Sequence, residues 1–209
     1  MPTFPRGTGA KPRLITPPRF PDGLQSWGVS GKWQFRAIQN MGRTWEEVYP
    51  VLNASLATVR ALFQALNQAI REGTLWDVQH LYWQTRLGAG GGTPLVNGAS
   101  QTGSNLVIDG ASPSITNWLR QGDIIQVAGG QVVFDVAGDV NTNGSGQATI
   151  PISPPIFVGH SPANDAAVTI DPTAIYFKAF ITNVADFPAL DVPRTLDAGL
   201  TVRWREQPQ

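Results

Sequence analysis

The segment from Leu119 to Ile156 alternates short apolar runs with turn-forming residues. It reads LRQGDIIQVAGGQVVFDVAGDVNTNGSGQATIPISPPI, and its apolar residues recur at two-residue spacing, so successive side chains are directed to opposite faces of a strand. The Gly-Gly and Asn-Gly pairs supply the positive φ angles that tight turns require. The segment therefore predicts a scaffold of short, half-buried strands, and it contains no catalytic motif.

Charge and aromatic content limit what the surface can do. Charged residues make up 14% of the 209 residues, well below the roughly 25% typical of soluble domains. Fifteen basic and fifteen acidic residues give a net charge of zero, so no overall field attracts nucleic acid or an anionic membrane. Seven tryptophans in a chain of such low charge predict a surface partly covered by protein partners, because interface centres are poor in charge and rich in aromatics. The alternative is that the tryptophans lie in the core.

Cysteine is absent from the chain, which excludes disulfides, thiolate chemistry and the usual zinc sites. The N-terminal segment lacks the apolar central region of a signal peptide, and no segment approaches the roughly 18 consecutive apolar residues of a membrane span. We therefore expect synthesis in the cytoplasm and no membrane anchoring.

The first 23 residues form a proline-rich arm. Its six prolines disfavour helix and favour an extended path. Such an arm either hangs free or lies along a neighbouring subunit. We expect the second arrangement, because the arm carries the apolar residues Phe4, Leu14, Ile15 and Phe20.

A strand and a helix are expected after the arm. Alternate residues between Trp27 and Ala37 are apolar, which predicts a half-buried strand with a bulge or bend at its glycines. Farther along, apolar residues at helical spacing predict an amphipathic helix that Asn53 or Ser55 caps and Gly73 ends. The predicted buried stripe of this helix consists of Leu56, Val59, Phe63, Leu66 and Ile70.

The second half of the chain is expected to be β throughout. Residues 75–87 are aromatic and β-forming on both parities, which predicts a strand covered on both sides. Gly88 to Gly92 predict a flexible junction. Residues 93–172 then predict a small all-β module, and longer strands return at 174–183 and 198–205.

These segments predict a mainly β fold with one long α-helix. We expect three parts: an extended arm at 1–23, a first domain formed by 24–88 together with 173–209, and a small all-β domain at 89–172 inserted into it. Insertion at an exposed glycine-rich loop is a tolerated arrangement.

One turn has half the pattern of a calcium loop. Asp139, Asn141, Asn143 and Gly144 match D-x-N-x-N-G, but Ile150 stands where the bidentate glutamate is required. The flanking segments are predicted strands, whereas an EF-hand loop lies between helices. We therefore favour a hairpin turn built from turn-forming residues over a metal site.

Other candidate chemistry has a plainer interpretation. The glycines at 88–92 are followed by Thr-Pro-Leu-Val and not by a helix, so they do not predict a nucleotide-binding turn. His80 and His160 lack a paired ligand spacing or a nucleophile elbow, and we expect His80 to be structural. Four acids could be imagined as a glycosidase pair, but turn and edge roles are favoured for Asp109, Asp123, Asp135 and Asp139. We predict no catalytic, cofactor or metal site, and no enzyme.

Four basic residues, three of them on two predicted strands, could form one face. Such a face would attract phosphates without regard to sequence, or it would be a solvated strand surface that discourages edge aggregation. The residues are Arg36, Arg194, Arg203 and Arg205.

Three phrases carry a resemblance to a known family. PLVNGASQTGSNLVIDG (94–110), WLRQGDIIQVAGG (118–130) and GSGQATIPISPPI (144–156) resemble tail-tip and minor tail proteins of long-tailed double-stranded DNA bacteriophages. The order of strand, helix, strand, inserted β module and returning strands also resembles that of distal tail proteins. The resemblance covers roughly Trp27 to Trp204. In many members a β domain that projects outward follows the domain that forms a ring. Here the small all-β domain is expected before the last strands of the first domain.

The resemblance implies a structural virion protein of the phage tail, made in the host cytoplasm. Its first domain would have a tail-tube-like fold of two packed sheets flanked by a helix, and it would form a homo-oligomeric, hexameric ring of the baseplate or tail tip. Expected partners are the tail tube protein, the tail-tip hub and the tape-measure protein, with DNA only as passing cargo. Within this ring we expect subunit contacts from Trp27, Trp33, Phe35, Leu200, Val202 and Trp204, and channel-facing Arg36, Arg203 and Arg205.

Two other function classes are weighed against the ring. A carbohydrate-binding or receptor-binding β module would stack sugars on an exposed Trp118 or Phe134. A hydrolase acting on cell wall would require a clustered acid or histidine site, with His80 and Asp123 as its first candidates.

Overall fold

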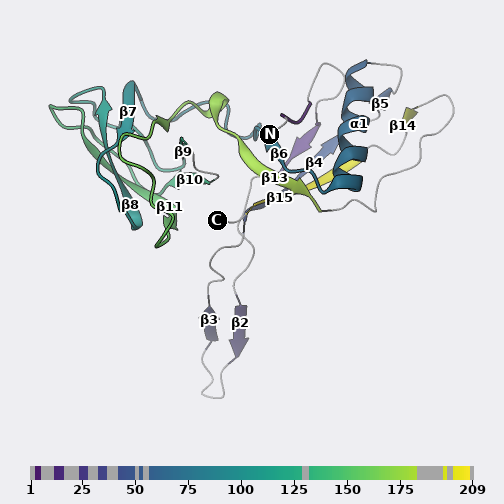
Figure 1. Ribbon diagram of the computed structural model, residues 1–209, viewed down its shortest axis with the longest axis horizontal. Coiled ribbons are helices and arrows are strands. Elements are labelled where there is room, and N and C mark those ends of the chain that lie inside the picture. The colour runs from purple at the N-terminus through teal and green to yellow at the C-terminus, as the bar shows by residue number, and fades with distance from the viewer. Residues whose placement is uncertain are drawn as a thin grey trace. The chain divides into compact units, whose positions relative to one another are not determined.

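The computed structural model describes residues 3–5, 12–16, 24–27, 33–36, 42–49, 52–53, 57–128, 132–182, 195–196 and 200–207. Within them the fold is mainly β with a single α-helix, as the sequence predicts (Figure 1). The chain divides into two compact units: a sheet unit, Met1–Val78 with Lys178–Gln209, and a barrel unit, Gln79–Phe177.

The sheet unit is built on a five-stranded sheet with the order β1-β4-β15-β13-β6, here called the main sheet. Its strands are β1 (Leu14–Ile15), β4 (Thr44–Tyr49), β15 (Leu200–Glu206), β13 (Phe177–Ile181) and β6 (Trp76–Val78). The central pair, β4 and β15, is antiparallel and in register from Leu200 opposite Tyr49 to Arg205 opposite Thr44.

The main sheet has one buried and one exposed face. Residues directly opposite each other in an antiparallel pair lie on the same face, so burial along β15 extends to β4. The alternation leaves Thr201, Arg203 and Arg205 outside and buries Leu200, Val202 and Trp204. The face buried with them also includes Trp45, Glu47, Tyr49, Ala179, Ile181 and Glu206.

Helix α1 (Ala57–Glu72) supplies the second apolar surface of the sheet unit. Its buried residues are Val59, Leu62, Ala65, Leu66 and Ala69, while Phe63 is half-buried. The predicted stripe is therefore rotated toward Leu62; Leu56 and the side chain of Ile70 lie outside the described residues. The helix ends at Gly73, whose φ is +59° and whose N–H donates to the Ala69 carbonyl at 3.0 Å. One sheet and one helix, each with one buried side, make a two-layer core.

Two short strand pairs complete the sheet unit. Strand β5 (Leu52–Asn53) pairs with β14 (Thr195–Leu196), and β2 (Leu24–Trp27) pairs with β3 (Trp33–Arg36). The single strand predicted from Trp27 to Ala37 is wrong. The chain reverses between β2 and β3, with Trp27 opposite Trp33, so two antiparallel strands replace the one that was expected. The glycines predicted to mark a bulge or bend, Gly28 and Gly31, lie outside the described residues.

The barrel unit is a six-stranded antiparallel sheet with the order β12-β9-β10-β11-β8-β7. Its strands are β7 (Gly92–Val96), β8 (Gly103–Ala111), β9 (Ile124–Val127), β10 (Val133–Val136), β11 (Ala148–Ile156) and β12 (Val168–Thr169). The first and last strands meet, because the N–H of Val96 donates to Ala166 and the N–H of Asp165 donates to Val96, both at 2.9 Å. The sheet thus closes into a near-barrel.

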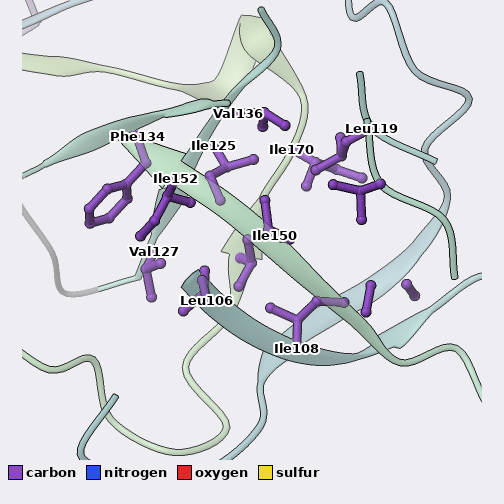
Figure 2. Close-up of a cluster of buried hydrophobic side chains, with 14 of the residues drawn as sticks. Leu106, Ile108, Leu119, Ile125, Val127, Phe134, Val136, Ile150, Ile152 and Ile170 are labelled. Carbon is purple, nitrogen blue, oxygen red and sulfur yellow. The ribbon is translucent and has the colours of Figure 1, made fainter. Parts of the chain in front are cut away.

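Alternation along the barrel strands fills its interior with aliphatic side chains. Figure 2 shows Leu106 and Ile108 from β8, Ile125 from β9, and Ile150 and Ile152 from β11 gathered in one cluster, and each is at most 2% exposed. These residues have the two-residue spacing from which the sequence predicts short strands. A 3-10 helix, η1 (Pro172–Ala174), leads out of the barrel; hydrogen bonds from the hydroxyl and N–H of Thr173 lower the pKa of its N-cap Asp171.

The segment that follows β6 is ordered, and it differs from both predictions made for it. The strand expected over 75–87 is only β6, and irregular chain follows it as far as Gly91. The glycines do not form a flexible junction: Gly90 N–H donates to the Trp118 carbonyl at 2.8 Å, and Ala89 N–H donates to Asn117 at 3.0 Å. The glycine-rich stretch therefore belongs to the barrel unit, and the unit boundaries lie at 78/79 and 177/178.

We expect Gly92→Ala to destabilise the barrel unit by about 1 to 3 kcal/mol in denaturant unfolding, since it combines a left-handed backbone with a clash. Gly92 has a φ of +82°, and an added Cβ would lie 2.5 Å from the Gly110 carbonyl oxygen. Gly98→Ala is the control, because Gly98 has a φ of +100° with nothing within 4 Å of the added Cβ. If the two variants lose equal free energy of unfolding, the close contact between an added Cβ at residue 92 and the Gly110 carbonyl has no cost.

Candidate assembly surface

The exposed face of the main sheet carries paired charges. Arg203 Nε donates to Glu46 Oε1 at 2.8 Å, and both side chains are about half exposed. Lys178 forms an ion pair with Asp77 across β13 and β6, where the two side chains are only 20% and 16% exposed. A shallow groove on this face is lined by Thr16, Thr44, Glu46, Thr182 and Arg203, and also by Trp45 and Trp204. The surface is therefore polar with locally balanced charge.

The predicted basic residues are placed unequally. Arg203 and Arg205 lie on the exposed face of β15, and Arg205 is opposite Thr44. The side chain of Arg36 and all of Arg194 lie outside the described residues. Because acidic partners on neighbouring strands pair with Arg203 and Lys178, this face is less basic than the sequence suggests.

The predicted interface residues fall into two groups. Leu200, Val202 and Trp204 are at most 2% exposed in the single chain, so their side chains form core and not a contact surface. The correction follows from the position of β15 in the middle of the main sheet. Trp27, Trp33 and Phe35 are in β2 and β3, and their side chains lie outside the described residues.

The arm pairs with its own unit at both edges of the main sheet. At one edge β1 pairs with β4, where Leu14 is opposite Val48 and remains 58% exposed. At the other edge Thr3 bridges Asp77 in parallel, and Phe4 N–H donates to the Asp77 carbonyl at 3.1 Å. The described apolar residues of the arm thus contact their own chain, which corrects the expectation that they lie on a neighbour; Phe20 lies outside the described residues.

Phe4 is the anchor of the arm at the β6 edge. Its ring is 3% exposed and makes edge-on contacts with Trp76 at 5.7 Å and with Trp204 at 4.6 Å between centroids. Burying a phenylalanine is worth about 1.5 to 3 kcal/mol, and each aromatic pair adds about 0.5 to 1.5 kcal/mol. We call the space between Trp76 and Trp204 the aromatic slot.

Two sets of buried polar side chains, which the sequence does not reveal, lie in the sheet unit. Glu47 accepts from Tyr49 Oη at 2.7 Å and from Trp45 Nε1 at 3.4 Å. Arg43 and Glu206 exchange backbone hydrogen bonds: Glu206 N–H donates to the Arg43 carbonyl, and Arg43 N–H donates to the Glu206 carboxylate. The hydrogen bonds of Glu47 stay within β4, whereas those between Arg43 and Glu206 join the end of β15 to the residue that precedes β4.

Asp123 is a structural acid. Its carboxylate is 2% exposed and accepts from the N–H groups of Leu87 at 2.6 Å, Gly88 at 3.0 Å and Arg120 at 2.9 Å. Nearby, the Arg86 guanidinium donates to the carbonyls of Gly88, Ala89 and Ile170. These two side chains hold the ordered segment before β7, so Asp123 is not arranged as a glycosidase acid.

The turn with the calcium-like pattern directs its oxygens to backbone donors. Asp139 Oδ1 accepts from Gln121, Asn141 Oδ1 accepts from Asn117, and Asn143 Oδ1 accepts from Ser145 and Gln147. Gln121 and Asn117 lie in other segments of the barrel unit, whereas Ser145 and Gln147 belong to the turn itself, so one side-chain oxygen of each of the three residues accepts from the backbone. The arrangement matches the structural turn that the sequence favours.

The remaining candidates also have structural surroundings. His80 is 2% exposed, accepts from Tyr82 N–H through Nδ1 and packs against Trp83 and Phe177. Trp118 and Phe134, expected to stack on sugars in the carbohydrate-binding alternative, are 0% and 7% exposed in the barrel core. The expectation that either side chain is exposed to stack on a sugar is therefore wrong.

The described residues contain no group of three or more histidine, cysteine or acidic side chains placed to hold a metal ion. The one α-helix of the described chain does not have the length and apolarity that a membrane span needs. A scan against models of known protein families found no match to the chain, and a search of curated proteins found none either.

Proposed function

We propose that the chain is a structural virion protein of a long-tailed double-stranded DNA phage. It forms a hexameric ring at the distal end of the tail, joins the tail tube to the tip complex, and surrounds the channel through which DNA and the tape-measure protein pass. The resemblance of the segments at 94–110, 118–130 and 144–156 supplies this identity.

The β2–β3 hairpin is the observation that carries the assembly part of the proposal. It forms a two-stranded sheet of its own, with no hydrogen-bonded strand joining it to the main sheet among the described residues. An isolated two-stranded hairpin is marginally stable in water. Aromatic residues stand in register on it, with Trp27 opposite Trp33 and Phe35 opposite Gln25. A neighbouring subunit would supply the missing strand or apolar surface.

The exposed face of the main sheet suits a channel wall. Its arginine and lysine side chains stand among the acids Glu46 and Asp77. Unpaired cations would bind phosphates and retain DNA, whereas paired charges leave the wall hydrated with little net attraction. Passing DNA would therefore meet a wall that does not hold it.

Replacing Trp33 and Phe35 together with glutamate tests the assembly. We expect the wild-type chain to sediment as a ring-sized oligomer at high concentration, and the double variant to sediment as a monomer with the same circular dichroism. Gln34→Glu is the matched control, since it adds a charge between the two positions at the opposite parity of the same strand. A wild-type chain that stays monomeric at every concentration, and that forms no rings in negative-stain images, contradicts the proposal.

A further inference from the structure

Both edges of the main sheet are closed by the arm of the same chain. Strand β1 pairs with β4 at one edge, and Thr3 bridges Asp77 of β6 at the other. Without these two segments, β4 and β6 would each leave one side of their backbone open. An open edge presents unpaired N–H and C=O groups to which another strand can add, and natural sheets therefore cover or interrupt their edges.

The two covering segments are too short to serve as templates for further strands. Strand β1 has two residues, and the contact at β6 is a single bridge. A proline stands close to each end of both segments; these prolines are Pro2, Pro5, Pro12 and Pro17. Because proline has no N–H and is confined to strand ends and edges, the arm closes each edge with a segment that cannot lengthen.

The position of Pro5 adds to this argument. The N–H of Phe4 is directed toward β6 and donates to the Asp77 carbonyl at 3.1 Å. A residue before proline is biased toward extended backbone, and successive N–H positions of an extended segment alternate between its two sides. The nitrogen of Pro5 therefore lies on the side away from β6, where it offers no donor to a strand that arrives from outside.

The Phe4 ring holds the segment at the β6 edge. It is 3% exposed in the aromatic slot and meets both indoles edge-on, at interplanar angles of 85° and 84°. The chain thus fills this slot with its own residue, and the cover at β6 depends on one side chain. In β1, by contrast, the side chain of Leu14 is mostly exposed.

From these contacts we infer that the proline-rich arm is an intramolecular edge guard. In each chain it covers the outer sides of β4 and β6 and ends the main sheet there, so the sheet does not add strands from other molecules. Any contact between subunits then forms away from these two edges. The guard acts within the single chain and does not depend on the proposed ring.

Phe4→Asp tests the guard in the full chain. A carboxylate cannot stay in the buried aromatic slot without a large desolvation cost, so residues 3–5 should leave β6 and uncover its edge. We expect the variant to form open-ended assemblies that scatter light roughly tenfold more than the wild type at the same concentration. Thioflavin T fluorescence should rise with the scattering, because strands added at an edge continue the β-sheet.

Two controls separate the uncovered edge from the side effects of the substitution. Leu14→Asp places the same charge on an exposed position of the arm and leaves Phe4 in its slot. Leu62→Ala removes a fully buried side chain from helix α1, outside the arm, and destabilises the sheet unit by opening a cavity. Below its unfolding transition, neither control should scatter more than the wild type.

The outcomes are distinct. Assemblies formed by Phe4→Asp and by neither control support the guard. Scattering of Phe4→Asp that stays at the wild-type level, in a variant whose red-shifted tryptophan emission shows that the slot has opened, overturns it. Equal scattering of Phe4→Asp and Leu62→Ala also overturns it, since lost stability then explains the association. Ring formation is judged separately, from the sedimentation of the wild type.

Discussion

Asp123→Ala is expected to destabilise the barrel unit by about 3 to 5 kcal/mol, one of the two largest effects that we predict. The buried carboxylate accepts three backbone N–H groups, from Leu87, Gly88 and Arg120. Each buried donor that loses its partner costs about 1 to 3 kcal/mol, and relaxation or entering water recovers part of the sum. The measurement is urea unfolding followed by near-ultraviolet circular dichroism.

The control for this variant is Asp139→Ala. Asp139 is exposed and accepts one backbone N–H, from Gln121 at 3.0 Å, in the same region of the barrel unit. Its loss should cost about 1 kcal/mol or less, because water replaces the carboxylate as acceptor. If Asp123→Ala unfolds at the same denaturant concentration as Asp139→Ala, the three hydrogen bonds do not hold the segment before β7.

Sequence periodicity predicts the barrel strands and the helix because each element has one buried side. Ile150 and Ile152 alternate with exposed or partly exposed neighbours and lie in the barrel core, where a two-residue spacing places them. The helix is similarly visible in its periodic apolar residues, although its stripe is centred on Leu62 and not on Phe63. Local pattern is sufficient in these cases since burial repeats with the period of the element.

The strand predicted over 75–87 does not continue past β6, where the chain is irregular: His80 is buried by tertiary contacts, Trp83 is partly buried and Tyr82 is 62% exposed. His80, Trp83 and Phe177 pack on one another, and Trp83 Nε1 donates to the Gly122 carbonyl. Phe177 is distant in sequence, so no local pattern shows this cluster. The flexible junction predicted at Gly88 to Gly92 is wrong for a similar reason, because hydrogen bonds to Asn117 and Trp118 order this stretch.

The candidate interface was harder to predict than the core. Alternation along β15 correctly separates Trp204 from Arg203, but it does not show that the chain itself covers the face that carries Trp204. The acidic partner Glu46 comes from β4, far away in sequence, and changes the character of the basic face. Both properties depend on strand order, which the sequence pattern does not specify.

Trp204→Ala is expected to destabilise the sheet unit by about 3 to 5 kcal/mol, the usual cost of replacing a buried large aromatic residue with alanine. Trp204 is 0% exposed, contacts Phe4 edge-on and stacks on Trp45 at 6.2 Å between centroids. The cavity would open the aromatic slot and loosen β15 at the centre of the main sheet. Differential scanning calorimetry should show the transition of the sheet unit move to lower temperature.

The control is Trp118→Ala, which removes an equally buried tryptophan from the barrel unit. Trp118 is 0% exposed and donates from Nε1 to the Gly91 carbonyl at 3.0 Å. Because the core cluster that contains Trp118 lies within the barrel unit, we expect this variant to shift the other calorimetric transition. If each variant lowers both transitions equally, the two units unfold as one cooperative body, and the division of the chain at 78/79 and 177/178 has no thermodynamic meaning.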